Sequence, residues 1–254
     1  ALSRGSVSVS YRWKSSFRMT VENRGLREAT KVWALKVLTD GTVISGDSLG
    51  HIQIWDGMSG TLTQSFDHNE NGADVLCLAV SEDENKIFAS GVDSSVRCIE
   101  RQALSVSADA DQDAMADFTP VRKWISSLSH RKHSHDVKAL AICLKGTNRS
   151  KPLELLVSGS VDTRICSYVA NDFKGSRPKV WYNWPSRSPI SHSCKQRLLA
   201  VTRDNRIDLY RVDSPDLADP SKIMCPESRD ETKCLVKTIS IDSPYNLCCS
   251  TISD

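Results

Sequence analysis

Residues 158–168 read Ser-Gly-Ser-Val-Asp-Thr-Arg-Ile-Cys-Ser-Tyr, and related stretches recur elsewhere in the chain. Each copy joins a strand pattern, a tight polar turn and a second strand pattern that ends in an aromatic or apolar residue. The other copies begin at Ser45, Ser90 and Thr202. A hairpin that is repeated at long intervals predicts an array of separate antiparallel sheets.

The spacing of these hairpins is typical of WD-type repeats, whose period is about 40–45 residues. Gly46 and Gly91 are 45 residues apart, and Asp162 and Asp204 are 42 apart. The longer interval of 68 residues from Gly91 to Gly159 indicates one repeat plus an insertion. We therefore predict an all-β fold, an incomplete WD-repeat β-propeller of about four blades with four antiparallel strands each.

The apolar strand patterns divide the chain into segments. We expect blades at about 32–67, 74–129, 136–184 and 190–241, followed by the start of a further blade at 245–254. An insertion at 102–118 is acidic and built from small residues, so we expect a disordered loop there. The polar first residues suggest that the chain begins inside a longer protein.

Composition favours a folded soluble protein, because hydrophobic residues make up 39% and charged residues 25% of the 254 residues. No apolar run is long enough to span a bilayer, and no signal-peptide pattern opens the chain. The nine cysteines form no Cys-x-x-Cys pair. We expect those in apolar strand patterns to be small buried hydrophobes in a reducing intracellular compartment; they are Cys77, Cys98, Cys143 and Cys166.

Charge is uneven along the chain although its net value is only +2. Residues 121–211 hold 18 basic and 6 acidic side chains, a surplus that can attract nucleic acid or an acidic protein. A solvated surface with nothing bound explains the same surplus equally well. Four basic residues lie near aromatic ones and are candidate RNA or partner contacts: Lys174, Arg177, Lys179 and Arg187.

The third repeat contains the residue types of a structural hydrogen-bond network. In WD-type blades, a buried chain of bonds runs from an aromatic residue through a hydroxyl and an imidazole to a turn carboxylate. The members expected here are His133, Ser158, Asp162 and Tyr168. The first repeat has Leu49 in place of the turn aspartate, and the second and fourth repeats lack the tryptophan, so we expect incomplete networks there.

Motifs for chemistry are absent from the sequence. His130, His133 and His135 lack a second ligand cluster with zinc spacing, and the acidic run at 109–113 lacks the glycine and glutamate of a calcium loop. No nucleophile elbow, phosphate-binding loop or zinc-protease motif occurs. We therefore predict no catalytic residue, no metal, no cofactor, no small-molecule substrate and no membrane contact.

Residues 32–56 carry a more specific signal than the generic repeat. A Trp-Ala-Leu strand leads into Asp-Gly-Thr-Val-Ile-Ser and ends at Trp55-Asp56. Together with residues 73–75, 133–137 and 191–210, this segment resembles the WD-repeat subunits of the nucleolar small-subunit processome, over roughly residues 10–252.

The resemblance implies tandem β-propellers in a nucleolar, non-catalytic scaffold. Such a scaffold assembles with other processome proteins on pre-ribosomal RNA, and supports small-subunit rRNA processing and rDNA transcription. The alternative is a peptide-reading propeller, such as a ubiquitin-ligase adaptor or chromatin reader, which needs charged side chains around its central channel. An enzyme is the weakest reading, because no nucleophile and base can be identified together.

Overall fold

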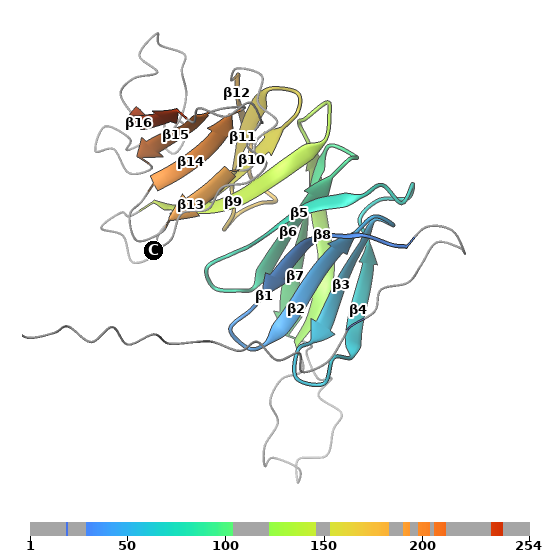
Figure 1. Cartoon of the computed structure of the whole chain (residues 1–254). Helices are drawn as coiled ribbons and strands as arrows, with labels where there is room; N and C mark the ends of the chain where they lie inside the picture. Colours follow the sequence, from blue (N-terminus) through green and yellow to red (C-terminus); the bar gives the residue numbers. More distant parts are fainter. Residues whose placement is uncertain are drawn as a thin grey trace, which may run out of the picture.

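The computed structural model describes residues 19, 29–103, 122–145, 153–182, 190–193, 198–203, 206–211 and 235–240. All regular structure in this part of the chain is β-strand, arranged as four antiparallel sheets of four strands (Figure 1). The predicted all-β fold with about four blades is thus confirmed. These residues contain no helix, and so none that could cross a membrane.

Each sheet is one blade, and we number the blades in chain order. Blade 1 contains β1 (Val32–Val37), β2 (Thr42–Asp47), β3 (His51–Asp56) and β4 (Leu62–Asp67). Blade 2 contains β5 (Val75–Val80), β6 (Lys86–Gly91), β7 (Ser95–Ala103) and β8 (Arg122–Arg131). Blade 3 contains β9 (Val137–Lys145), β10 (Leu153–Ser160), β11 (Arg164–Val169) and β12 (Lys179–Tyr182). Blade 4 contains β13 (Ile190–Ser193), β14 (Leu198–Arg203), β15 (Arg206–Arg211) and β16 (Leu235–Ser240).

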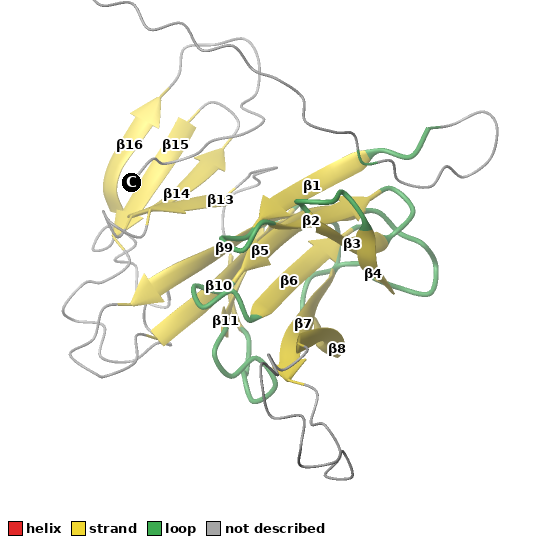
Figure 2. Cartoon of the chain, turned by 90° about the horizontal axis from the view of Figure 1, so that it is seen from below, coloured by secondary structure: helices red, strands yellow, loops and turns green. Residues whose placement is uncertain are grey.

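Every blade is a simple meander, in which each strand pairs with the next one in sequence. The first strands of consecutive blades, β1, β5, β9 and β13, lie beside one another. Figures 1 and 2 show the same sequence of sheets from two directions. The first strands therefore form the inner edge of the array, and the fourth strands form its outer edge.

The insertion after β7 starts later than the sequence indicates. Gln102 and Ala103 belong to β7 and pair with Lys123 and Arg122 of β8. The expected loop at 102–118 was therefore wrong at its first two residues, because the register of a long hairpin carries them into the sheet. The rest of that segment, and the expected further blade at 245–254, lie outside the described residues.

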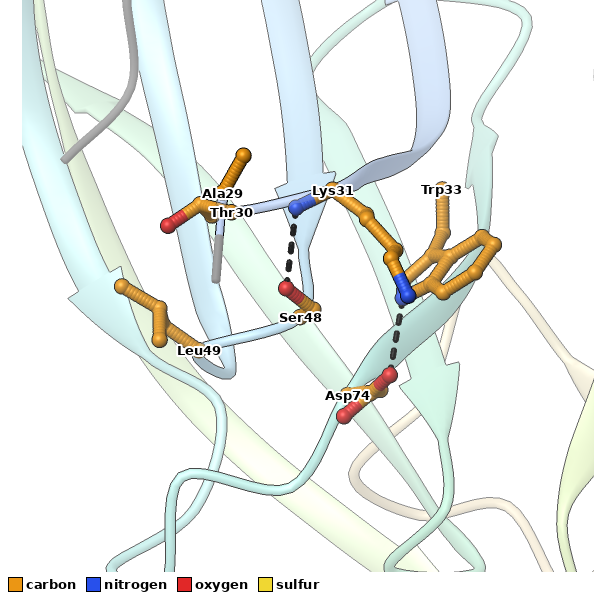
Figure 3. A pocket seen from close by; sticks show the side chains of 7 residues that line it. All are labelled: Ala29, Thr30, Lys31, Trp33, Ser48, Leu49 and Asp74. Carbon is orange, nitrogen blue, oxygen red and sulfur yellow. Dashed lines mark hydrogen bonds between the residues drawn. The ribbon is translucent and has the colours of Figure 1, made fainter. Parts of the chain in front are cut away.

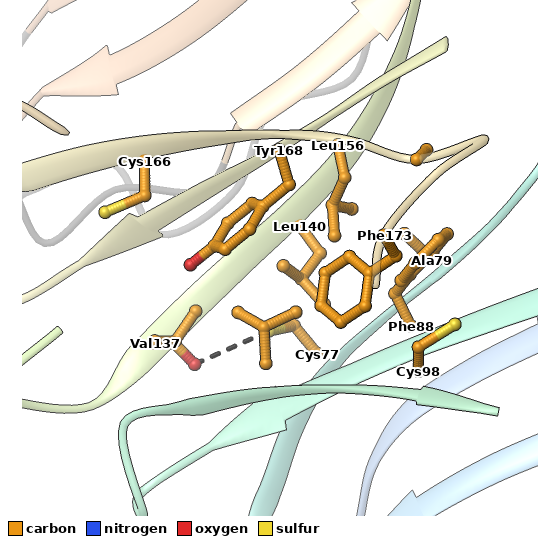
Figure 4. Close-up of a cluster of buried hydrophobic side chains, with 12 residues drawn as sticks. Cys77, Ala79, Phe88, Cys98, Val137, Leu140, Leu156, Cys166, Tyr168 and Phe173 are labelled. Atoms are coloured by element: carbon orange, nitrogen blue, oxygen red, sulfur yellow. Dashed lines mark hydrogen bonds between the residues drawn. The ribbon is translucent and has the colours of Figure 1, made fainter. Parts of the chain in front are cut away.

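Apolar layers fill the space between neighbouring blades. Between blades 1 and 2, fully buried isoleucines of β2 and β3 meet side chains of β5 to β8, including Val75 and Trp124. Between blades 2 and 3, Phe88 meets Leu156, Tyr168 and Phe173 (Figure 4). A third cluster joins β9, β10 and β11 to β14. Burial of these faces is the main favourable contribution to folding.

Polar contacts join blades 1 and 2. The side-chain amide of Gln64 in β4 donates to the carbonyl of Trp124 in β8 at 3.1 Å and accepts from its N–H at 2.9 Å. A second link joins Arg101 of β7 to Asp40 of blade 1 at 2.7 Å, and the same guanidinium lies 4.9 Å from the centroid of the Trp124 ring. Blades 1 and 2 are thus held by directional bonds as well as by packing.

The strand cysteines behave as the sequence indicates. Cys77, Cys98, Cys143 and Cys166 are buried free thiols. Burial raises the pKa of Cys98 and Cys166 to about 12, so both thiols stay protonated and unreactive at neutral pH.

Candidate functional site

The best-defined polar site lies at the turn of blade 3. His133 precedes β9 and is 4% exposed. Its Nδ1 lies 3.2 Å from each carboxylate oxygen of Asp162, and its Nε2 lies 2.7 Å from the Ser158 hydroxyl. Asp162 also accepts the backbone N–H groups of Ser134 and Arg164, both at 2.9 Å. The imidazole and the carboxylate thus fasten the loop before β9 to the β10–β11 turn.

Electrostatics keep this site in one charge state near neutral pH. Burial lowers the pKa of His133, and this effect outweighs the attraction of the Asp162 carboxylate. For Asp162 itself burial acts to raise the pKa, but hydrogen bonds from Ser134 and Arg164 and the nearby His133 lower it overall. A neutral imidazole therefore lies beside an ionised carboxylate, with both acceptor and donor positions used in structural bonds.

The expected hydrogen bond from Tyr168 to this network is not formed in the structure. The Tyr168 side chain is buried, but its hydroxyl has no hydrogen-bond partner among the described residues. Ser158 already bonds His133, and its hydroxyl lies 3.5 Å from the Cys166 carbonyl. The tyrosine ring instead packs against Phe173, with ring centroids 5.6 Å apart. Tyr168 therefore contributes mainly apolar packing, although its hydroxyl lies close enough to Ser158 for the two groups to interact.

In blade 1 a tryptophan forms the hydrogen bond to the strand serine that Tyr168 does not form in blade 3. Trp55, at the position equivalent to Tyr168 in the strand register, donates from Nε1 to the Ser45 hydroxyl at 3.0 Å. The turn carboxylate expected to be missing at Leu49 is supplied by Asp47, whose Oδ1 accepts the N–H groups of Leu49 and His51 at 2.9 Å each. The β2–β3 turn is thus stabilised by a carboxylate that lies two positions before the one expected.

Blade 2 contains a histidine–aspartate pair that the sequence analysis missed. His68 is fully buried before β5, and its Nε2 lies 2.9 Å from Asp93 Oδ1. Asp93 also accepts the N–H of Ser95 in the β6–β7 turn at 3.1 Å. The sequence contains a pattern that could have predicted this pair, since His68 precedes Asp74-Val75 much as His133 precedes Asp136-Val137.

The histidines considered as metal ligands are engaged in structural bonds. Both ring nitrogens of His133 face Ser158 and Asp162, and Nε2 of His130 lies 2.9 Å from the Phe173 carbonyl. Within the described ranges, no group of three His, Cys, Asp or Glu side chains has the geometry to hold a metal ion.

The structure describes the side chains of two of the four basic candidates. Lys174 and Arg177 are exposed in the segment between β11 and β12, and neither makes an ion pair within the part of the chain that the structure describes. Lys179 begins β12 and pairs with Ser167, but its side chain lies outside the described part. Arg187 is outside the described residues altogether.

A small pocket lies where blade 1 meets blade 2, and the sequence analysis did not indicate it (Figure 3). Trp33 of β1 is 47% exposed, and its Nε1 donates to Asp74 Oδ2 at 2.8 Å. The Lys31 ammonium lies 5.7 Å from the centroid of the indole ring. The pocket has a volume of about 210 Å³, and its lining comprises Ala29, Thr30, Lys31, Trp33, Ser48, Leu49 and Asp74.

A family model described as "WD domain, G-beta repeat" matches residues 60–100. The matched segment starts with the outer strand β4 and continues through β5, β6 and most of β7. The fold and this match define the chain as a WD-repeat β-propeller protein.

The chain is similar in sequence to particular curated proteins. The chain is 32% identical over 198 residues to "U3 small nucleolar RNA-associated protein 4" of Schizosaccharomyces pombe, covering 78% of this chain and 25% of that protein. It is 27% identical over 228 residues to the mouse homologue, covering 87% of this chain and 29% of that protein. The chain thus spans between a quarter and a third of the length of these relatives.

Solved structures share the fold at lower identity. "Structure of U3-55K" and "Crystal structure of RRP9 WD40 repeats" each give a TM-score of 0.53 at 14% identity, covering 76% of this chain and 51% of theirs. At that identity the likeness establishes the fold alone.

Proposed function

We propose that this chain is part of a non-catalytic WD-repeat scaffold for ribosome biogenesis, which assembles on pre-ribosomal RNA in the small-subunit processome. The observation that carries the proposal is the similarity to "U3 small nucleolar RNA-associated protein 4" over 78% of the chain. The same description applies to similar proteins of mouse, human and Saccharomyces cerevisiae. The implied location is the nucleolus, and the implied partners are other processome proteins.

A scaffold role agrees with how the polar groups of the described blades are used. The buried Ser, His and Asp side chains of blade 3 fasten one loop to one turn, and His133 uses both ring nitrogens for that purpose. Among the described residues, Ser158 carries the only hydroxyl bonded to this imidazole, and it is fully buried, so a substrate could not reach it without opening the blade. The blades therefore supply rigid loops and faces for partners rather than reacting groups.

Direct RNA contact at the β11–β12 segment is the finer part of the proposal. Lys174 and Arg177 are exposed cations without a described ion-pair partner, which suits phosphate binding. Reversing both charges (K174E with R177E) should weaken RNA binding and reduce its salt dependence by about one to two released counterions. Lys123→Glu in β8 is a matched control, because Lys123 is also an exposed cation. Equal losses in the control and the double variant would argue against a local contact.

The test of the scaffold proposal is affinity purification of the full-length protein from nuclear extract, followed by identification of bound RNA. We expect enrichment of U3 small nucleolar RNA and of pre-ribosomal RNA over unrelated nuclear RNAs. Recovery of a ubiquitin ligase or of histones, with neither RNA enriched, would support the peptide-reading alternative instead.

A further inference from the structure

The inner strands of three blades share an irregularity at the same position. Pairing shifts between Val32 and Ala34 in β1, and between Val75 and Cys77 in β5. In β9 the shift lies where Val137 and Ala139 face the end of β10. Each shift leaves one residue outside the ladder, as in a β-bulge, which redirects a side chain. The residues concerned are Trp33, Leu76 and Lys138.

Trp33 is the one aromatic residue of this set, and its bulge turns it toward blade 2. Its Nε1 bonds Asp74, the residue before β5, while its ring remains half exposed. Asp74 Oδ1 has no hydrogen-bond partner within the described residues. An indole ring, with the Lys31 ammonium over it, and a carboxylate oxygen therefore lie at one small pocket (Figure 3).

Backbone contacts hold this arrangement in place. The carbonyl of Asp74 accepts the N–H of Val92 at 3.1 Å, and a Cβ on Gly91 would lie only 1.8 Å from that carbonyl oxygen. On the other side, Lys31 and Ser48 are joined by two hydrogen bonds of 2.9 Å. The backbone of the pocket is therefore fixed before a ligand binds, and only the Lys31 side chain would have to move.

The surrounding charge favours a cation. The described residues of blades 1 and 2, 29–103 and 122–131, hold 8 basic and 11 acidic side chains, a net charge of −3. A flat cation can stack on an indole and pair with a carboxylate at the same time, as a guanidinium does. At about 210 Å³ the pocket is smaller than the roughly 300–1,000 Å³ of sites for drug-sized ligands, and it suits one side chain.

We propose that the Trp33–Asp74 pocket binds an arginine side chain in a basic segment of a partner protein. The chain's own Lys31 ammonium lies over the indole, in the region that the guanidinium would occupy. Lys31 is exposed and its side chain makes no described ion pair, so it can move aside. The site does not depend on a role in ribosome assembly.

The experiment follows the indole N–H resonance of Trp33 in the full ¹⁵N-labelled chain, assigned by comparison with Trp33→Phe. The probe is Nα-acetyl-arginine amide, and the control is the uncharged citrulline analogue. We expect a saturable shift with the arginine compound and little with the citrulline one. Asp74→Asn should weaken binding at least about fivefold, and Lys31→Ala should tighten it by removing a competing cation.

Three outcomes would overturn the proposal. The Trp33 resonance does not respond to arginine, or it responds equally to citrulline, or Lys31→Ala weakens binding. The last result, together with a response to oligouridylate, would assign the pocket to nucleic acid. Ser65→Ala, an exposed change in β4, serves as the folding control, and it should leave the titration unchanged.

Discussion

The carboxylate of Asp162 ties three separate groups of blade 3 together. It accepts two backbone N–H groups and faces the buried imidazole of His133. Replacing it with alanine leaves the buried imidazole and two backbone donors without this partner. Asp162→Ala should therefore lower the free energy of unfolding by about 1–3 kcal/mol, measured by chemical denaturation of the full chain. Asp67→Asn, at a largely exposed side chain, is the control, and an equal loss there would contradict this account.

The hydroxyl of Tyr168 leads to an opposite prediction. It is buried without a partner among the described residues, so its removal abolishes an unpaired polar group while the ring contacts remain. Tyr168→Phe should be neutral or stabilising, within about 1 kcal/mol. The measurement is the same denaturation series. A loss above 1 kcal/mol would show that the hydroxyl is bonded after all.

At the residue scale, the sequence predicts which side chains lie close together better than it predicts which hydrogen bonds they form. Spacing brought His133, Ser158 and Asp162 together correctly, because all three depend on the hairpin register. It could not show that Trp55 forms a hydrogen bond to its serine while Tyr168 forms none, since that depends on how each ring packs in its layer. His68 was missed because a longer loop separates it from its strand.

Among elements, the contact between β4 and β8 depends on one side chain. Gln64 bonds both the N–H and the carbonyl of Trp124, much as a neighbouring strand would. Gln64→Ala leaves both backbone groups without this partner, and should cost about 1–3 kcal/mol of stability. The neighbouring change Ser65→Ala should cost little, because Ser65 is exposed. Thermal melts of the two variants in parallel test this, and equal melting temperatures would refute it.

The loop before β9 should make stability depend on pH. Burial depresses the pKa of His133 in the fold, so the unfolded chain binds a proton more readily. The contribution of His133 to the free energy of unfolding is therefore complete above about pH 6.5, the usual pKa of histidine. This contribution is lost as pH falls below that value. Denaturation midpoints between pH 7.5 and 5 should fall less steeply in His133→Gln than in the unchanged chain. His135→Gln, at an exposed position, should keep the original slope, and identical slopes in all three proteins would exclude His133 as a cause.

Strands were predictable because each blade repeats the same apolar pattern with polar turns between. The end of β7 was not, since Gln102 and Ala103 have no apolar signal and are held by pairing with β8. The β-bulges in the inner strands could not be predicted from the sequence either. The extra residue causes no visible break in the alternation of apolar and polar residues. The Trp33 pocket depends on such a bulge and on a contact between blades, which only the folded chain shows.

On the scale of the molecule, successive blades are joined by apolar layers, and blades 1 and 2 also by a link between their outer strands. Charge is divided between them, with an acidic surplus in residues 29–103 and a basic surplus in 121–211. An arrangement of this kind presents unlike surfaces to different partners. That property suits the scaffold role proposed above.

Sedimentation of the full-length protein from nuclear extract tests the scaffold account most directly. We expect most of the protein to travel in large particles together with U3 small nucleolar RNA, and to shift to lighter fractions after ribonuclease treatment. A protein that sediments only as a small free species, unaffected by ribonuclease, would contradict the account.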